Sequence, residues 1–106
     1  MATIPSLPYY RISQLPQHVG ETVLLKGWLY QSSSKGKLHF LKLRDGSGFV
    51  QCVVYKNDVT EEEFNVAGHL RQESTVYVWG EVRSDARAPF FPYEVSVKGL
   101  ALMGEP

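Results

Sequence analysis

Two short segments rich in β-branched, leucine and aromatic residues, 38–44 and 49–55, flank the sequence Asp-Gly-Ser-Gly at residues 45–48. Glycine supplies the positive φ that tight turns need, so this pattern predicts a β-hairpin. Successive side chains of a strand point to opposite faces, so each can be assigned to one of two faces. The predicted inner face comprises His39, Leu41 and Leu43 on one strand, and Val50, Cys52 and Val54 on the other.

The opposite face of this hairpin combines aromatic, amide and cationic side chains: Phe40, Lys42, Arg44, Phe49, Gln51, Val53 and Tyr55. An exposed ring can stack on an unpaired nucleobase, and a neighbouring amide can donate to and accept from the base edge. In the alternative interpretation, Phe40 packs under the N-terminal arm or a neighbouring domain, since single surface aromatics are common.

The sequence VTEEEF at residues 59–64 predicts the start of a helix. Thr60 is expected at the N-cap and Glu63 three residues later, as in a capping box, with Val59 and Phe64 forming a hydrophobic staple. The acidic side chains suit the positive end of the helix dipole, and we favour this interpretation over an acidic catalytic site. The helix is expected to end near Gly68.

The remaining segments alternate between strands and polar connections. Ser13 is expected to cap a single helical turn limited by Pro16 and Gly20. Gly27 suggests a bulge or a sharp bend in the first strand. The predicted segments are an extended arm over 1–9, strands over 22–30, 74–83 and 93–102, a polar loop over 31–37 and a proline-containing loop over 84–92.

The predicted order of elements is three strands, a helix and two strands. This is the order of an all-β OB-fold, a five-stranded Greek-key barrel, here with one helix between strands three and four and a short N-terminal helical turn. A long hairpin protein with a docked helix is the alternative, and Gly27 and Gly80 favour the barrel. We expect an arm over 1–12, the OB domain over 13–103 and the start of a hinge or the chain end at 104–106.

Composition narrows the class of protein. The 106 residues fit one domain, and 11 basic against 11 acidic residues give a formal net charge of zero, which counts against a generally basic nucleic-acid binder. Cys52 is the single cysteine, and the three histidines lack the spacing of metal ligands, so no metal is expected. Without an apolar run near ~20 residues or a secretory signal, we expect a cytoplasmic protein with no membrane association.

The sequence contains no catalytic arrangement that we can identify. We interpret Ser32, Ser33 and Ser34 as part of a flexible loop rather than as nucleophiles. The sequence contains neither of the glycine motifs that bind phosphates, GxxxxGK(S/T) and GxGxxG. Arg44 and Asp45 suggest either a local ion pair or an Asp-initiated turn. No catalytic residue is therefore predicted.

The stretch GWLYQSSSKGKLHFLKLRDGSGFVQCVV resembles the N-terminal anticodon-binding domain of class IIb aminoacyl-tRNA synthetases, most of all the asparaginyl type. The resemblance continues through VTEEEF, QESTVYVWGEVR and RAP to YEVSV, and covers roughly residues 10–102. It implies a domain that grips the tRNA anticodon loop.

The resemblance also implies roles for individual residues. Phe40 matches the aromatic residue on which the central anticodon uridine stacks, and Gln51 matches the glutamine that hydrogen-bonds that base. Arg83 and Glu94 fall where the family contacts the first anticodon base and the RNA backbone. By position and charge, Lys35, Lys37 and Lys42 are expected to contact phosphates.

Two departures from the family pattern predict weaker tRNA binding than is typical. Ser32 and Ser33 stand where the family loop usually carries arginines, and at Ser33 a base and phosphate contact is lost. Phe90 and Phe91 follow the Ala-Pro and bulk up the loop on the binding side.

The family implies a larger parent protein. Such a parent would carry a catalytic domain that uses ATP and magnesium to activate an amino acid. The family also implies a parent that can form a homodimer. This chain alone is expected to need no cofactor and not to aminoacylate. The alternative is a free-standing or repurposed OB module that binds protein partners or single-stranded nucleic acid.

Overall fold

The hairpin predicted from the turn sequence is present with the predicted strand bounds. The computed structural model describes residues 4–88 and 91–106 of the chain. Within these residues the elements are η1 (Ile12–Gln17), β1 (Thr22–Lys35), β2 (Leu38–Arg44), β3 (Phe49–Tyr55), η2 (Lys56–Asp58), α1 (Glu61–Gly68), β4 (Thr75–Ser84) and β5 (Tyr93–Gly104).

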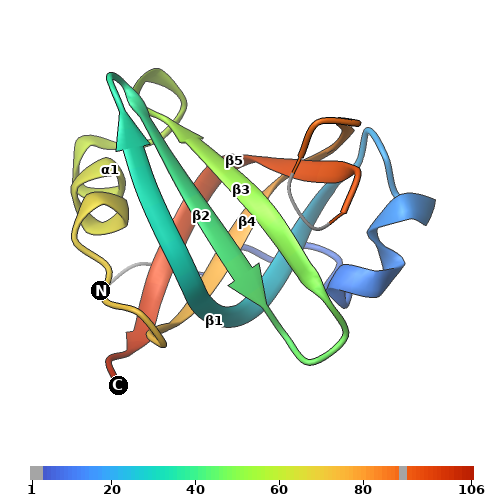
Figure 1. Cartoon of the computed structure of the whole chain (residues 1–106), viewed down its shortest axis with the longest axis horizontal. Helices are drawn as coiled ribbons and strands as arrows, with labels where there is room; N and C mark the ends of the chain where they lie inside the picture. The colour runs from blue at the N-terminus through green and yellow to red at the C-terminus, as the bar shows by residue number, and fades with distance from the viewer. Residues whose placement is uncertain (1–3, 89–90) are drawn as a thin grey trace.

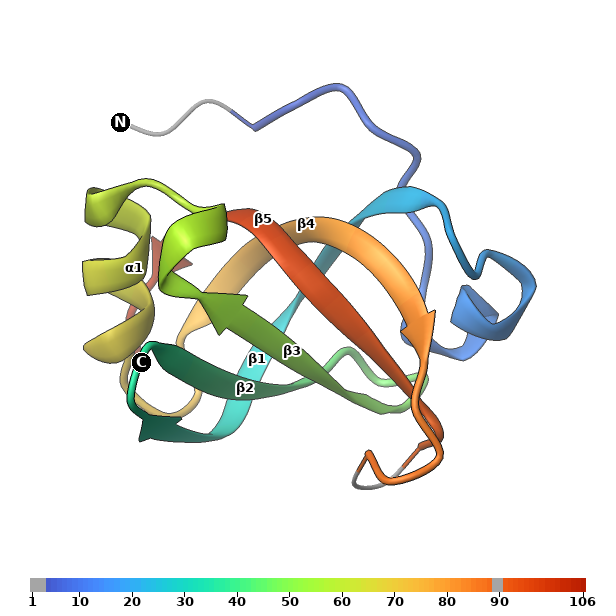
Figure 2. The ribbon, with the colours of Figure 1, turned by 90° about the horizontal axis from the view of Figure 1, so that it is seen from above.

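The five described strands close into a barrel in the order β1-β2-β3-β5-β4 (Figure 1). The β3–β5 pair is parallel and the other four neighbouring pairs are antiparallel. With α1 between β3 and β4, this is the predicted OB-fold rather than an open hairpin protein. Figures 1 and 2 show α1 at one end of the barrel and η1 at the other.

The barrel core confirms the predicted inner face of the hairpin. Leu41, Leu43, Val50, Cys52 and Val54 are fully buried, and they pack with apolar side chains from the other strands. Burial raises the pKa of the Cys52 thiol, so this side chain remains protonated and acts as a small core residue.

His39 shares the inner face but lies at the α1 end of the barrel, where it is only half-buried. Its ring stacks on Phe64 of α1 with 4.1 Å between ring centroids. Burial lowers the pKa of His39, which favours the neutral ring between barrel and helix.

The helix α1 begins as its sequence predicts. The Glu63 backbone N–H donates to Thr60 Oγ1 at 3.1 Å, and the Thr60 backbone N–H donates to Glu63 Oε1 at 2.9 Å. This reciprocal capping box satisfies two backbone donors that the first turn of a helix leaves without partners. Val59 and Phe64 pack against the core, and the helix ends at Gly68.

The prediction that Ser13 caps the N-terminal helical turn is wrong. The 3₁₀ helix η1 begins at Ile12, whose backbone N–H donates to Asp45 Oδ2 at 2.8 Å. Asp45 also accepts from the Ser47 backbone N–H at 2.8 Å, within the β2–β3 turn. The capping carboxylate therefore comes from a residue 33 positions away, which local sequence does not reveal.

The prediction of a polar loop over residues 31–37 is also wrong, because residues 31–35 belong to a strand. Strand β1 continues to Lys35, and residues 31–35 pair with residues 38–42 of β2. The bulge suggested at Gly27 instead occurs at Tyr30, where the β1–β2 register shifts. Gly27 allows the backbones of β1 and β2 to approach each other closely, since a Cβ at this position would lie 2.6 Å from the Arg44 carbonyl oxygen. Gly80 does lie at a register shift, between β4 and β5.

The described part of the N-terminal arm is extended, as predicted, and runs beside β1. The Leu24 backbone N–H donates to the Pro8 carbonyl at 2.8 Å, and the Tyr10 N–H donates to the Leu24 carbonyl at 3.3 Å. Among the described residues, no helix has both the length and the apolar character needed to cross a membrane.

Candidate functional site

A row of polar side chains crosses all five strands of the barrel. Gln31 of β1 pairs with Lys42 of β2, and Lys42 pairs with Gln51 of β3. Gln51 then pairs with Glu94 of β5, and Glu94 pairs with Arg83 of β4. Directly paired residues share one face of a sheet, so these five residues form one continuous line, which we call the cross-strand row.

Phe40 lies beside the cross-strand row on the same outer face. It comes two residues before Lys42 in β2 and pairs with Ser33 on one side and Val53 on the other. Phe40 and Gln51 are therefore diagonal neighbours, a relationship that the sequence left open. The side chain is half-buried, and its ring has no aromatic partner among the described residues.

Lys42 is held in the cross-strand row by its β1 neighbour. Its Nζ donates to Gln31 Oε1 at 3.2 Å. This contact depends on the extension of β1 past the bulge, because a loop would not place Gln31 opposite Lys42. Sequence reasoning missed Gln31 for that reason.

Glu94 is the acidic member of the row. Burial raises the pKa of its carboxyl, and the charge of Asp85 raises it further, while Arg83 and Arg87 oppose the shift. Arg83 itself is exposed and faces solvent at the β4 edge of the row. The cross-strand row therefore ends with the half-buried carboxyl group of Glu94 next to the exposed guanidinium group of Arg83.

Lys35 and Lys37 lie at the tip of the β1–β2 hairpin, and both are exposed. Lys35 pairs with Leu38, which lies two residues before Phe40, so Lys35 shares the outer face. Lys37 belongs to the turn, and its carbonyl accepts from the Lys56 backbone N–H at 2.9 Å. The predicted site residues therefore occupy one face and the adjoining hairpin tip.

A group of aromatic side chains continues this face past the row. The Tyr30 and Phe49 rings meet edge to face at 5.1 Å, and the Arg44 guanidinium lies 5.3 Å from the Trp28 ring centroid. The partner of Arg44 is Glu73, with which it forms an ion pair, rather than the adjacent Asp45. Asp45 is the start of a turn, so the second of the two predicted alternatives is correct.

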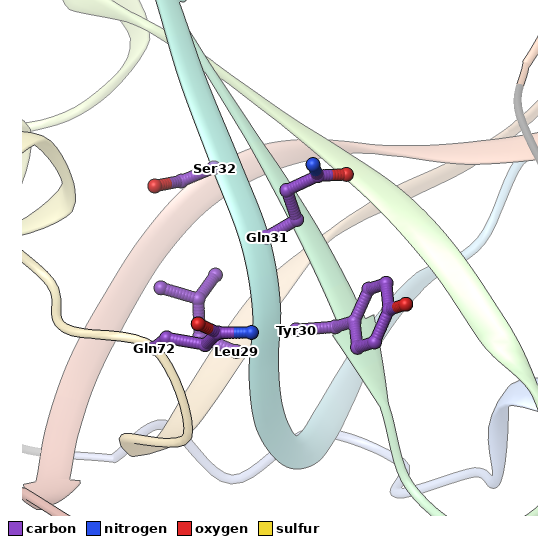
Figure 3. Close-up of a pocket in the computed structure, with 5 residues that line it drawn as sticks. All are labelled: Leu29, Tyr30, Gln31, Ser32 and Gln72. Carbon is purple, nitrogen blue, oxygen red and sulfur yellow. The ribbon is translucent and has the colours of Figure 1, made fainter.

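A surface pocket of about 340 Å³ lies at the β1 bulge (Figure 3). Its lining comprises Leu29, Tyr30, Gln31, Ser32 and Gln72. Figure 3 shows Gln72 approaching β1 from the loop that precedes β4, on the side of the strand away from Tyr30. The pocket adjoins the cross-strand row through Gln31, but Phe40 and Gln51 lie outside it.

Of Phe90 and Phe91, which are predicted to add bulk to the β4–β5 loop, the structure describes Phe91. Phe90 lies outside the described residues. Phe91 packs against the barrel core, and its ring centroid lies 5.0 Å from that of Tyr93. The Phe91 side chain is therefore half-buried against its own domain.

Comparison with known proteins gives one consistent result. A family model described as an OB-fold nucleic acid binding domain matches residues 23–102. An asparagine–tRNA ligase from Deinococcus deserti is 56% identical over 94 residues, which are 89% of this chain and 21% of that protein. The corresponding ligase from Thermus thermophilus is 48% identical over 95 residues, 90% of this chain and 22% of that protein.

Solved structures agree with the sequence relatives. The crystal structure of asparaginyl-tRNA synthetase from Pyrococcus horikoshii, complexed with asparaginyl-adenylate, superposes with a TM-score of 0.84 at 41% identity. The match covers 92% of this chain and 22% of that one. The chain thus spans about a fifth of the length of the curated relatives it matches. The resemblance seen in the sequence is confirmed.

Proposed function

Because the chain belongs to the family of OB-fold nucleic-acid-binding domains, we propose that it is the anticodon-binding domain of an asparagine–tRNA ligase. The observation that carries this proposal is the position of Phe40 beside the cross-strand row. An aromatic ring next to amide and charged side chains, on the β2–β3 face of an OB-fold, is an arrangement suited to unpaired bases.

Phe40 and Gln51 would hold one base between them. The half-buried Phe40 ring offers a stacking platform, and stacking on such a ring is worth roughly 1–3 kcal/mol. The Gln51 amide lies diagonally across from it and can donate and accept at once, as the edge of a base requires. The ring would supply affinity and the amide would supply selectivity.

The charged residues would position the rest of the loop. Glu94 can accept a hydrogen bond from a neighbouring base, and Arg83 beside it can contact a base or the backbone. Lys42, Lys35 and Lys37 would meet phosphates, from the row and from the hairpin tip. Because the chain has no net charge, this local group of cations would carry most of the electrostatic attraction.

The proposal extends to a parent protein. Residues 1–12 would be an arm, 13–103 the tRNA-binding domain and 104–106 the start of a hinge to a catalytic domain. That domain would use ATP and magnesium to attach asparagine to tRNA in the cytoplasm, and the parent would form the homodimer. Asparagine–tRNA ligase is the name of the relatives that match this chain at 46–56% identity.

A binding titration tests the role of Phe40. Labelled asparagine tRNA anticodon stem-loop is titrated with the wild-type chain and with Phe40→Leu, which keeps apolar bulk but removes the ring. The stacking energy of roughly 1–3 kcal/mol predicts about 5- to 150-fold weaker binding of the variant. Tyr9→Ala, which removes an exposed ring from the arm, is the matched control and should bind as the wild type does.

Two results would contradict the proposal. One is no binding of the stem-loop by the wild-type chain at low salt. The other is unchanged affinity for Phe40→Leu with an unchanged thermal melt, which would show that the ring is not the platform. Equal affinity for unrelated single-stranded oligonucleotides would indicate a general single-strand binder instead.

A further inference from the structure

We infer that His39 is a positioning residue for the proposed RNA face: it links the tip of the β1–β2 hairpin to α1 and so keeps that face ordered. This inference rests on the proposed function, because it concerns the same RNA-binding face. His39 itself does not contact RNA in this proposal, since its side chain lies on the other face of β2 from Phe40. It acts through the part of β1 that pairs with β2.

The last five residues of β1 have little of their own to keep them in a strand. Residues 31–35 are polar and exposed, and three of them are serines, which favour turns as readily as strands. Their pairing with β2 nevertheless places Gln31 opposite Lys42 and Ser33 opposite Phe40. Any loosening of this segment would therefore disturb the face on which RNA is proposed to bind.

A side-chain contact joins this segment to His39. Ser34 pairs with His39 in the antiparallel ladder, and Ser34 Oγ lies 2.6 Å from His39 Nδ1, which is a hydrogen-bonding distance. A neutral imidazole has one nitrogen that donates and one that accepts, and a hydroxyl can do both. The tip of β1 is thus tied to a ring that belongs to β2.

The same ring is held by α1, which lies beside this end of β2 (Figures 1 and 2). It stacks on Phe64 with 4.1 Å between ring centroids and 28° between ring planes. On Gly68, a Cβ would lie 2.9 Å from His39 Nε2, so glycine leaves room for the ring at the end of the helix. We call His39, with its contacts to Ser34, Phe64 and Gly68, the His39 bridge.

The surroundings of the ring favour its neutral form. Burial lowers the pKa of His39, a hydrogen bond with the Phe64 backbone opposes this shift, and the charge of His69 lowers the pKa further. Glu63 of α1 is directed elsewhere, because its carboxylate accepts from the backbone N–H groups of Thr60 and Leu100. The neighbours of the ring that carry no ionisable side chain are Ser34 on β1, Val54 on β3, and Phe64 and Gly68 on α1.

Protonation of His39 should therefore weaken the His39 bridge. Because the pKa of His39 is lowered by folding, the stability that the neutral ring contributes is fully present above the unfolded pKa of about 6.5. That stability is lost as pH falls through 6.5 toward the folded value. RNA affinity should follow, because apparent affinity scales with the fraction of the protein in the binding-competent state.

The first test changes the hydroxyl partner. Ser34→Ala removes the hydroxyl, whereas Ser34→Thr keeps it on a side chain that suits a strand. In the free chain at one fixed pH, Ser34→Ala should make amide hydrogen exchange of residues 31–35 about two- to tenfold faster, as expected for the loss of one hydrogen bond. Its affinity for the labelled anticodon stem-loop should fall by a similar factor. Ser34→Thr should restore both quantities.

The second test displaces the ring from the side of α1. Gly68→Ala places a methyl group against His39, although alanine favours a helix more than glycine does. Faster exchange of residues 31–35 and weaker RNA binding would therefore come from the ring contact and not from helix propensity. Asn65→Ala, at an exposed position of the same helix, is the matched control and should change neither quantity.

A pH profile separates a titrating ring from a merely structural one. His39→Phe can still stack on Phe64 but does not titrate. Between pH 7.5 and 5.5, the affinity of the wild type should fall relative to that of His39→Phe. Since pH 5.5 is about one unit below the ordinary histidine pKa, this relative loss can reach about tenfold. Comparing the two proteins at each pH cancels the titration of the RNA and of other side chains.

The possible failures are distinguishable. If Ser34→Ala leaves exchange or RNA affinity unchanged, or if the wild type and His39→Phe share one pH profile, the inference is overturned. The proposed function then still stands as long as Phe40→Leu weakens binding. If the wild-type chain does not bind the stem-loop, the proposed function fails and the RNA role of His39 fails with it. The exchange measurements would then decide by themselves whether the His39 bridge holds the hairpin.

Discussion

Ser33 of β1 lies directly opposite Phe40 of β2 in the antiparallel ladder, and its side chain is exposed. Opposite side chains in such a pair have Cβ atoms about 4.5–5.5 Å apart. A small neutral hydroxyl therefore stands beside the proposed base-stacking ring, at the position where the family pattern leads us to expect arginine. This pairing gives a structural reason for the weaker tRNA binding predicted from the sequence.

Ser33→Arg should restore a cation beside Phe40. We expect tighter binding of the anticodon stem-loop at low salt, because the guanidinium can contact a phosphate or stack with the base. Each added phosphate contact on single-stranded RNA should steepen the dependence of log K on log salt by about 0.7. Titrations at several salt concentrations measure both quantities.

Ser13→Arg adds the same charge on η1, at the other end of the barrel, and is the matched control. It should change affinity and salt dependence little. If the two variants tighten binding equally, the gain is a general effect of net charge, and the pairing of Ser33 with Phe40 does not matter.

Glu94→Gln should stabilise the free domain at neutral pH. Burial and Asp85 raise the pKa of Glu94 in the folded state, so its ionised form is less favourable there than in the unfolded chain. The stability associated with the raised pKa is present below the unfolded pKa and is lost as pH rises through the folded value. Thermal melts should therefore show a higher Tm for Glu94→Gln at pH 7, with the difference shrinking as pH falls toward about 4.

Glu105→Gln is the control for this pH dependence. Glu105 is exposed, and its oxygen lies 3.9 Å from Arg71 Nη1, a contact expected to contribute little to stability. A wild-type Tm at neutral pH equal to that of Glu94→Gln would contradict the expected cost of the Glu94 charge.

Thr60→Ala should weaken the start of α1. It removes the side-chain oxygen that accepts from the Glu63 backbone N–H. Loss of an N-cap costs about 1 kcal/mol, which corresponds to a fall of roughly 4–8 °C in Tm for a domain near this size. Thr60→Ser keeps the oxygen and should melt close to the wild type. Equal Tm values for Thr60→Ala and Thr60→Ser would show that the side-chain cap contributes nothing to the stability of the domain.

Gly80→Ala should damage the barrel itself. A Cβ at Gly80 would lie 2.1 Å from the Ser96 carbonyl oxygen, a backbone atom that cannot rotate away. We expect a loss of several kcal/mol, or failure to fold, measured by the urea midpoint. Gly48→Ala, whose Cβ would meet only Ile12 Cγ2 at 3.5 Å, should be tolerated far better. Equal midpoints for the two variants would mean that β4 and β5 can separate at the bulge without cost.

The accurate sequence predictions concern features that neighbouring residues control. The bounds of β2 and β3 follow from two segments rich in β-branched, leucine and aromatic residues around a glycine turn, and the start of α1 follows from the Thr60 and Glu63 capping box. Each depends on residues only a few positions apart. The inner and outer faces of the hairpin were predictable for the same reason.

The wrong predictions concern features that distant residues control. Residues 31–35 are polar and show no strand periodicity, yet pairing with β2 makes them part of β1. The start of η1 depends on Asp45, which lies 33 positions away.

The sequence by itself determined the hairpin, its two faces and the helix cap, because local hydrogen bonds and side-chain alternation specify them. Only the tertiary structure decided that Gln31, Lys42, Gln51, Glu94 and Arg83 form one line, since that line needs the register of four strand pairs. It also decided that Ser33 faces Phe40 and that Gln72 closes a pocket at the bulge. The physical reason is that strand register is specified by barrel closure, a bulge and long-range hydrogen bonds, which involve residues far apart in the chain.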